Sequence, residues 1–325
     1  MPMLSRLFRR PARRSEGWDL GAAETRMVAL CGSSLNQIRL ETYTFAPRGT
    51  PVRTGGKANR RTTRRTVALP AAQSIMEILP FRPSENPLHT GQTDTEHRTQ
   101  AADYTEFHLA GLGLPDNIVH DHHLFAARHT DSSALLIAAA RAEAAAAQLE
   151  QAAALGLKAD YLDIDILALA NAFLFGSQPA ADGCRILLRL ESESIQMLAF
   201  DNGRVCHIQE TLLPTAADSP DSENRRPAFQ TASTDAVCRE AQHLLQLYRH
   251  TRNPAAMPDI TLTGTLASTV ESGLAAAGLP ARCRHPIHAL DPDIAEADAA
   301  RLSTAFGLAL KPFIASAARS ESAGR

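Results

Sequence analysis

Short apolar runs separated by polar turns mark the expected strands in the first half of the chain. Such runs occupy residues 17–21, 26–30, 38–43, 67–69, 134–138 and 161–164. The first three, with Gly and Ser between them, predict a β-meander or hairpin. Residues 141–155 and 166–175 have high helix propensity, and Gly156 stands where a C-terminal cap belongs. A helix is also expected directly after residue 70.

The second half repeats this pattern. Strands are expected at residues 184–190, 194–200 and 259–263, and helices at 235–249, 269–277 and 303–310. The turn Asp201-Asn202-Gly203-Arg204 is typical of a β-hairpin. Both halves thus begin as a meander and continue with alternating strands and helices, which predicts an α/β fold with a duplicated architecture.

Polar, proline-interrupted segments divide these elements into expected domains. Residues 47–66, 80–100 and 215–231 have too few apolar side chains to build a core. The expected organisation is a basic leader at 1–14, a first domain at 15–180, a second domain at 183–312 and a flexible tail at 313–325. The first domain would carry the basic loop 47–66 and a small α+β insertion at about 71–138.

Charge is distributed unevenly along the chain. The net charge of −2 combines residues 1–66, with 14 basic and four acidic residues, and the rest, with 19 basic and 31 acidic ones. In the leader, apolar residues alternate with Arg6, Arg9, Arg10, Arg13 and Arg14, which suits docking on an anionic membrane surface; a frayed, solvated arm is the alternative. A peripheral position at a membrane is therefore one expectation.

Other functional classes find little support. No apolar run is long enough to span a membrane, and five scattered cysteines favour a cytoplasmic protein with reduced thiols. The basic loop 48–65 contains no aromatic residue, so no nucleic acid partner is expected. His120, His122 and His123 alternate between the faces of a strand, which excludes a local metal site. Asp163 and Asp165 are expected to cap the helix that starts at residue 166. No catalytic residue and no metal ligand are assigned.

The first strand–turn–strand segment, residues 17–30 (GWDLGAAETRMVAL), resembles the first phosphate motif of the actin-like ATPase superfamily. Further stretches in matching order narrow the resemblance to the PilM family of type IV pilus assembly proteins: residues 67–70, 107–115, 135–173, 260–264 and 305–310. The resemblance spans roughly residues 15–312. It implies an actin-like two-domain fold related to that of the cell-division protein FtsA.

The PilM resemblance also implies function. Members bind nucleotide in a central cleft, so ATP with Mg²⁺ is the implied cofactor. They hold a short N-terminal cytoplasmic segment of the membrane protein PilN in a groove on the first domain, and act as scaffolds with other pilus platform components. By motif position, the nucleotide-binding candidates are Asp19, Gly21, Arg26, Glu240 and Gly264.

The chain departs from the family pattern at the second phosphate motif. The Asp-x-Gly positions fall on Arg189 and Glu191, which removes a metal-water ligand and places a carboxylate where a phosphate should approach. His243 stands at the position of the arginine that contacts the nucleoside. We therefore expect weak or lost nucleotide binding, no turnover enzyme, and a scaffold at the inner-membrane platform involved in twitching motility. The alternatives are an active ATP-binding member of the superfamily and a module of a related secretion or competence platform.

Overall fold

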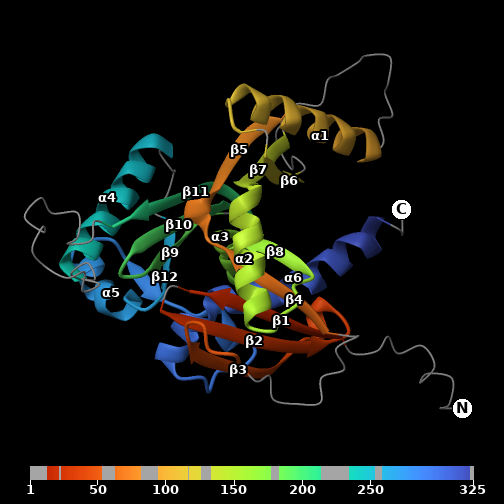
Figure 1. Ribbon diagram of the computed structural model, residues 1–325. Coiled ribbons are helices and arrows are strands. Elements are labelled where there is room, and N and C mark those ends of the chain that lie inside the picture. Colours follow the sequence, from red (N-terminus) through yellow and green to blue (C-terminus); the bar gives the residue numbers. More distant parts are fainter. Residues whose placement is uncertain are drawn as a thin grey trace, which may run out of the picture.

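Two five-stranded sheets with helices between them, and a third, smaller sheet, make up the molecule (Figure 1). The computed structural model describes nine segments: residues 13–21, 23–52, 63–81, 94–115, 117–125, 133–176, 183–213, 234–252 and 258–322.

The first sheet has the strand order β3-β2-β1-β4-β8. Its strands are β1 (Arg13–Leu20), β2 (Glu24–Gly32), β3 (Arg39–Pro47), β4 (Thr63–Leu69) and β8 (Tyr161–Ile164). The first three pair antiparallel as the predicted meander, and β4 and β8 add to β1 in parallel. Helix α2 (Ala142–Ala154) covers the outer face, where Ala152 packs against Trp18 and Val67. The short 3₁₀ turn at Leu35–Gln37 joins β2 to β3.

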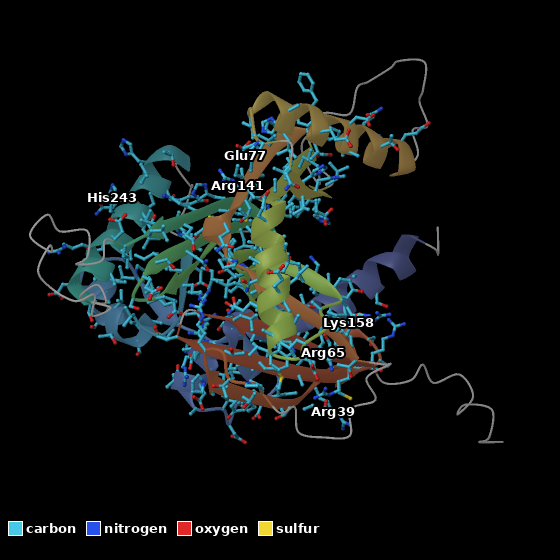
Figure 2. The ribbon with its side chains drawn as sticks, viewed as in Figure 1. Arg39, Arg65, Glu77, Arg141, Lys158 and His243 are labelled. Carbon is cyan, nitrogen blue, oxygen red and sulfur yellow. The ribbon has the colours of Figure 1, made fainter. Side chains whose placement is uncertain are left out.

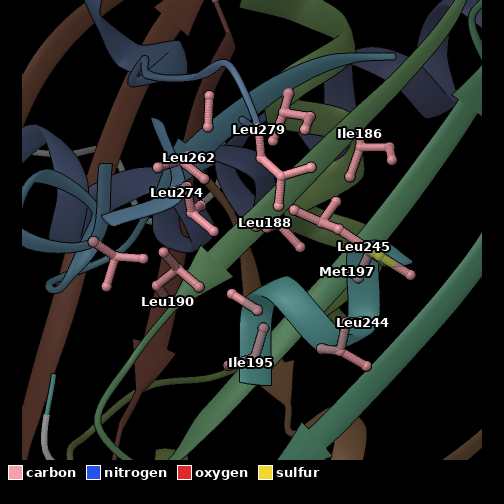
Figure 3. Close-up of a cluster of buried hydrophobic side chains, with 14 of the residues drawn as sticks. Ile186, Leu188, Leu190, Ile195, Met197, Leu244, Leu245, Leu262, Leu274 and Leu279 are labelled. Atoms are coloured by element: carbon pink, nitrogen blue, oxygen red, sulfur yellow. The ribbon is translucent and has the colours of Figure 1, made fainter. Parts of the chain in front are cut away.

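The second sheet repeats the topology, with the order β11-β10-β9-β12-β13. Its strands are β9 (Cys184–Leu190), β10 (Ser194–Asp201), β11 (Arg204–Leu212), β12 (Asp259–Thr263) and β13 (Ala281–Cys283). Asn202 and Gly203 both have positive φ, 50° and 74°, in the predicted hairpin turn. Helices α4 (Thr234–Arg252) and α5 (Ala267–Ala276) close the outer face over an apolar core (Figure 3). The duplicated α/β architecture is confirmed.

Helices α3 (Asp165–Gly176) and α6 (Glu296–Ser322) pack against each other between the two sheets (Figure 1). Two glycines of this layer permit very close backbone approach. A Cβ on Gly307 would lie 1.8 Å from the carbonyl oxygen of Ala168, and one on Gly17 would lie 2.0 Å from that of Ala305. Any larger residue would push α6 away from α3 or from β1. The 3₁₀ turn Pro286–Ala289 leads into α6.

The third sheet, of order β5-β7-β6, lies in the first half of the chain, over the residues where an α+β insertion is expected. It contains β5 (Ser74–Phe81), β6 (Ile118–Phe125) and β7 (Ser133–Arg141), and α1 (Asp94–Gly111) lies across it. Leu109 of α1 packs on Leu135 and Ile137 of β7 in a small core of its own.

The structure differs from the sequence-based expectation at several points. The helix expected after residue 70 is the short 3₁₀ turn Ala71–Gln73 followed by β5. The basic loop ends earlier than expected, because β4 begins at Thr63. The last helix continues through Pro312 to Ser322, so residues 313–322 are not a flexible tail.

Helix α6 also changes the domain assignment, which had grouped residues up to 312 with the second half. Phe306 and Leu310 pack on Val28 and Leu30 of β2, so the helix covers the inner face of the first sheet. No helix in the described segments is both long and apolar enough to cross a membrane.

Candidate functional site

The first phosphate motif forms the end of β1 and the turn into β2. Asp19 of β1 and Arg26 of β2 are cross-strand partners, and Arg26 Nη1 lies 3.4 Å from Asp19 Oδ2. Arg26 Nε also donates to Glu24 Oε1 at 2.8 Å. Gly21 follows in the turn, where a Cβ would lie 3.0 Å from the carbonyl oxygen of Glu24. The structure thus brings three of the predicted residues, Asp19, Gly21 and Arg26, to one turn.

The second phosphate motif faces the first across the gap between the sheets. Arg189 lies near the end of β9 with its side chain 12% exposed, and its Nη2 is 4.0 Å from Asp19 Oδ2. Its Nε points to Glu191 Oε1 at 3.3 Å. This juxtaposition agrees with the motif positions inferred from the sequence. A guanidinium therefore lies directly against the carboxylate that the resemblance assigns to phosphate and metal.

Asp165, at the start of α3, is a further member of this cluster. Its Oδ1 accepts hydrogen bonds from the backbone N–H of the next residue, Ile166, at 2.6 Å and from that of Ala71 at 2.9 Å. Its Oδ2 lies 3.8 Å from Arg189 Nη1 and accepts a hydrogen bond from Gln196 Nε2 at 3.2 Å. We call Asp19, Asp165, Arg189, Glu191 and Gln196 the cleft cluster.

Burial and the nearest opposite charges shift the pKa values of Asp165 and Arg189 in opposite directions. Burial raises the pKa of Asp165 to about 6; Arg189 and the Gln196 hydrogen bond lower it, whereas Asp19 and Glu210 raise it. Burial also disfavours the charge on Arg189, but the carboxylates of Glu191, Asp19 and Asp165 outweigh it and raise the pKa of this arginine. Arg189 is therefore a permanent buried cation, and its charge is balanced by the chain's own carboxylates.

The predicted adenosine-side turn at Gly264 packs against the same strand end. Gly264 has a φ of +96°, and a Cβ there would lie 2.5 Å from the carbonyl oxygen of Leu190. The next residue, Thr265, donates to Glu191 Oε2 at 2.5 Å. Glu191, which stands at the glycine position of the second phosphate motif, therefore holds this turn against β9.

Glu240 and His243, which stand at the positions expected to contact the nucleoside, contact each other. His243 Nδ1 lies 3.6 Å from Glu240 Oε1, one turn away on α4. The His243 side chain is 66% exposed and lies at the periphery of the molecule (Figure 2). Neither has a contact with the cleft cluster among the interactions resolved in the described segments.

The cleft cluster does not fit a metal-bound nucleotide. Asp19 is already engaged by Arg26 and lies beside Arg189, so its carboxylate is not free to hold a hydrated cation. Glu191 and Glu210 add negative charge where a polyphosphate would have to enter. In the described part of the chain no cluster of His, Cys, Asp or Glu could hold a metal ion, and His120, His122 and His123 lie in β6 as expected.

The leader arginines proposed for membrane contact are only partly within the structure. Arg6, Arg9 and Arg10 lie outside the described residues. Arg13 is exposed and donates to Ser316 Oγ at 2.8 Å. The expectation that Arg14 contacts a membrane is wrong. Arg14 is 9% exposed in β1 and pairs with Glu16 and Glu41, so it is not available to a membrane surface.

The end of the basic loop is also neutralised within the fold. Arg64 Nη1 donates to Asp160 Oδ1 at 2.9 Å, and Arg65 Nε donates to Glu16 Oε2 at 2.8 Å (Figure 2). Glu16 is fully buried beneath Arg14 and Arg65. Part of the positive charge of residues 1–66 is therefore structural, and the remainder of the loop, residues 53–62, lies outside the described segments.

Comparison with known proteins places the fold. No family model and no curated protein matches the sequence. The structure is similar to one described as the "PilM-PilN type IV pilus biogenesis complex", with a TM-score of 0.65, 18% identity, and coverage of 92% of this chain and 98% of that one.

Two weaker similarities are to a Bacteroides thetaiotaomicron protein with an actin-like ATPase fold and to ethanolamine utilization protein EutJ from Carboxydothermus hydrogenoformans. Their TM-scores are 0.46 and 0.41, each at 12% identity. The first covers 88% of this chain and 95% of that one, the second 93% and 91%. The first similarity shows the fold: this chain has the fold of the structure described as the PilM-PilN complex, as the PilM resemblance of its sequence implied.

Proposed function

We propose that this chain, which has a PilM-type actin-like fold, is a scaffold of a type IV pilus assembly platform. In this role it binds the N-terminal cytoplasmic segment of a PilN-type membrane protein and contacts other platform components. The support is the similarity to a solved PilM-PilN complex, which extends over nearly the whole length of both chains. The partner supplies the membrane anchor, and the chain works at the inner membrane from its cytoplasmic side, in pili of the kind used for twitching motility.

The observation that carries the non-catalytic part of this proposal is the position of Arg189. Its guanidinium lies 4.0 Å from Asp19 Oδ2, where the resemblance expects a phosphate and its metal. A second cation and a polyanion cannot enter without breaking the ion pairs that neutralise the buried arginine. The scaffold is accordingly proposed to work without nucleotide, as a pseudo-ATPase.

Co-purification tests the partner. The tagged chain is co-expressed with the PilN-type protein encoded in the same genome, either intact or lacking its N-terminal cytoplasmic segment. A variant with that segment scrambled controls for its charge. We expect capture of the intact protein only. Equal recovery of all three forms, or of none, would contradict the proposal.

A further inference from the structure

Arg189 joins parts of the molecule that belong to different halves. It extends from β9 in the second sheet, whereas Asp19 is the last residue but one of β1 in the first sheet and Asp165 begins α3 between the sheets. One guanidinium therefore lies within 4.0 Å of Asp19 and within 3.8 Å of Asp165. The first half supplies the carboxylates of Asp19 and Asp165, and the second half supplies the guanidinium that lies near both.

A buried glutamine extends this connection. Gln196 of β10 is 2% exposed, and its side-chain oxygen accepts a hydrogen bond from Arg189 Nη1 at 3.3 Å. Its Nε2 donates to Asp165 Oδ2 at 3.2 Å and to Glu210 Oε1 at 2.8 Å. The amide thus links the second sheet to α3 by a hydrogen bond in addition to the ion pairs.

Without the arginine this region would carry unbalanced negative charge. Asp19, Asp165 and Glu191 would face one another across the halves, with Glu210 close behind. Like charges in a poorly hydrated gap repel strongly, and this repulsion would separate the halves.

We propose that Arg189 is a built-in latch, whose guanidinium holds the two halves of the molecule closed across the cleft without any ligand. The inference builds on the loss of nucleotide binding proposed above, but not on the pilus partner. The proposal goes beyond the loss of a nucleotide site, because it assigns a structural role to Arg189 at the position of the motif's aspartate. Since this cation is part of the chain, the closed arrangement of the two halves is permanent.

A second cleft arginine provides a matched control. Arg301 of α6 pairs with Glu24 of β2 and lies over the Phe45 ring, with the guanidinium carbon 3.9 Å from the ring centroid. All three residues belong to or pack on the first sheet. Arg301→Met therefore removes a paired guanidinium of similar size whose ion pair with Glu24 stays within the first half, and it loses only a weaker attraction to Glu191 of the second.

Hydrogen–deuterium exchange of the whole chain tests the latch. Arg189→Met keeps the length of the side chain and removes its charge. We expect exchange to become about tenfold faster, or more, in both the β1–β2 turn and the β9–β10 turn, since each loses its cross-cleft partner. Arg301→Met should change exchange near Glu24 and speed exchange in the β9–β10 turn far less than Arg189→Met does, because Arg301 only attracts Glu191 from a distance.

Two results would overturn the latch. One is unchanged exchange in the β1–β2 turn of Arg189→Met; the other is protection of both turns in the wild type by MgATP, because a ligand that fits would have to displace the guanidinium.

If Arg189→Met does not fold, Arg189→Lys serves instead, since lysine keeps the charge but cannot contact two carboxylates in the forked manner of arginine. Its exchange should be faster than that of the wild type in both turns, and unchanged exchange overturns the proposal. Partner binding is not measured, so failure of the pilus proposal leaves this test valid.

Discussion

At the residue scale, the molecule depends on buried charges that are paired within the chain. Arg189 is balanced by Asp19, Asp165 and Glu191, and Glu16 is balanced by Arg14 and Arg65. Removing one member of such a group leaves an uncompensated charge in a region with little water, which costs far more than removing an exposed pair. The two groups therefore lead to separate predictions.

The first concerns the pH dependence of stability through Asp165. Its pKa is about 6 in the folded protein against the ordinary value of 3.8, so the folded state binds this proton more tightly than the unfolded chain. The contribution of Asp165 to the unfolding free energy must then fall as pH rises from about 4 to about 6.

Urea unfolding of the wild type and of Asp165→Asn measures this contribution. Between pH 4.5 and 7.5, the stability of the wild type relative to Asp165→Asn should fall by about 2 kcal/mol. The asparagine variant removes the titrating group while other titrations stay common to both proteins. A difference that is constant or rises with pH would contradict the assignment.

The second concerns Glu16, which is fully buried and accepts hydrogen bonds from Arg65 and from Trp18 Nε1. Glu16→Ala leaves two guanidinium groups without their buried partner, and should lower the unfolding free energy by about 3–5 kcal/mol. Glu41→Ala is the control, since Glu41 also pairs with Arg14 but its side chain is 41% exposed, and it should cost less than about 1 kcal/mol. Similar decreases in the unfolding free energy of both variants would contradict the claim that burial makes the ion pairs of Glu16 more important for stability.

Sequence reasoning identified Asp19, Arg189 and Glu191 of the cleft cluster, but not the parts that Asp165 and Gln196 play in it. The hairpin signal at Asn202 and Gly203 gave the register of β9, and so identified Arg189 and Glu191 as replacements. Asp165 was assigned only as a helix cap, because its contact with Arg189 depends on how α3 packs between the sheets. Nothing local marks Gln196 either, since a lone glutamine in an apolar strand has no recognisable spacing.

At the element scale, α6 is the helix that differs most from expectation. Sequence periodicity predicted residues 303–310, whereas the helix runs over Glu296–Ser322 and packs on β1, β2 and α3. Its polar ends have no strong apolar stripe, and Pro312 is a usual breaker, so local propensity underestimates it. Likewise, β5 was mistaken for a helix because its short apolar run satisfies either period, and pairing with β7 decides the outcome.

The packing of α6 makes Gly307 sensitive to substitution. A Cβ there would lie 1.8 Å from the carbonyl oxygen of Ala168, a backbone atom that cannot rotate away. Gly307→Ala should lower the unfolding free energy by about 3 kcal/mol, at the upper end of overpacking effects. Gly111→Ala, at the end of α1 with nothing within 4 Å of the added Cβ, should change it by less than about 0.5 kcal/mol. Urea titration of both variants gives the comparison, and equal stability of the two would refute the close approach of α3 and α6.

At the scale of the whole molecule, the charge asymmetry of the sequence has a different meaning in the structure. Residues 1–66 have a net charge of +10 from their composition, but Arg14, Arg26 and Arg65 are paired inside the fold and Arg64 pairs with Asp160 at the surface. If residues 1–66 contact a membrane, the contact must come from basic residues other than these four paired arginines. The duplicated pair of sheets, by contrast, was predictable from repeated patterning alone, because each half encodes a meander followed by strands and helices.

The central claim is that this two-sheet scaffold binds its peptide partner without nucleotide. The most direct measurement is fluorescence anisotropy of a labelled synthetic peptide with the N-terminal sequence of the PilN-type protein, titrated with the chain in the presence and absence of MgATP. The account predicts saturable binding with the same dissociation constant under both conditions. Binding that requires MgATP, or no binding up to millimolar concentrations of the chain, would contradict it.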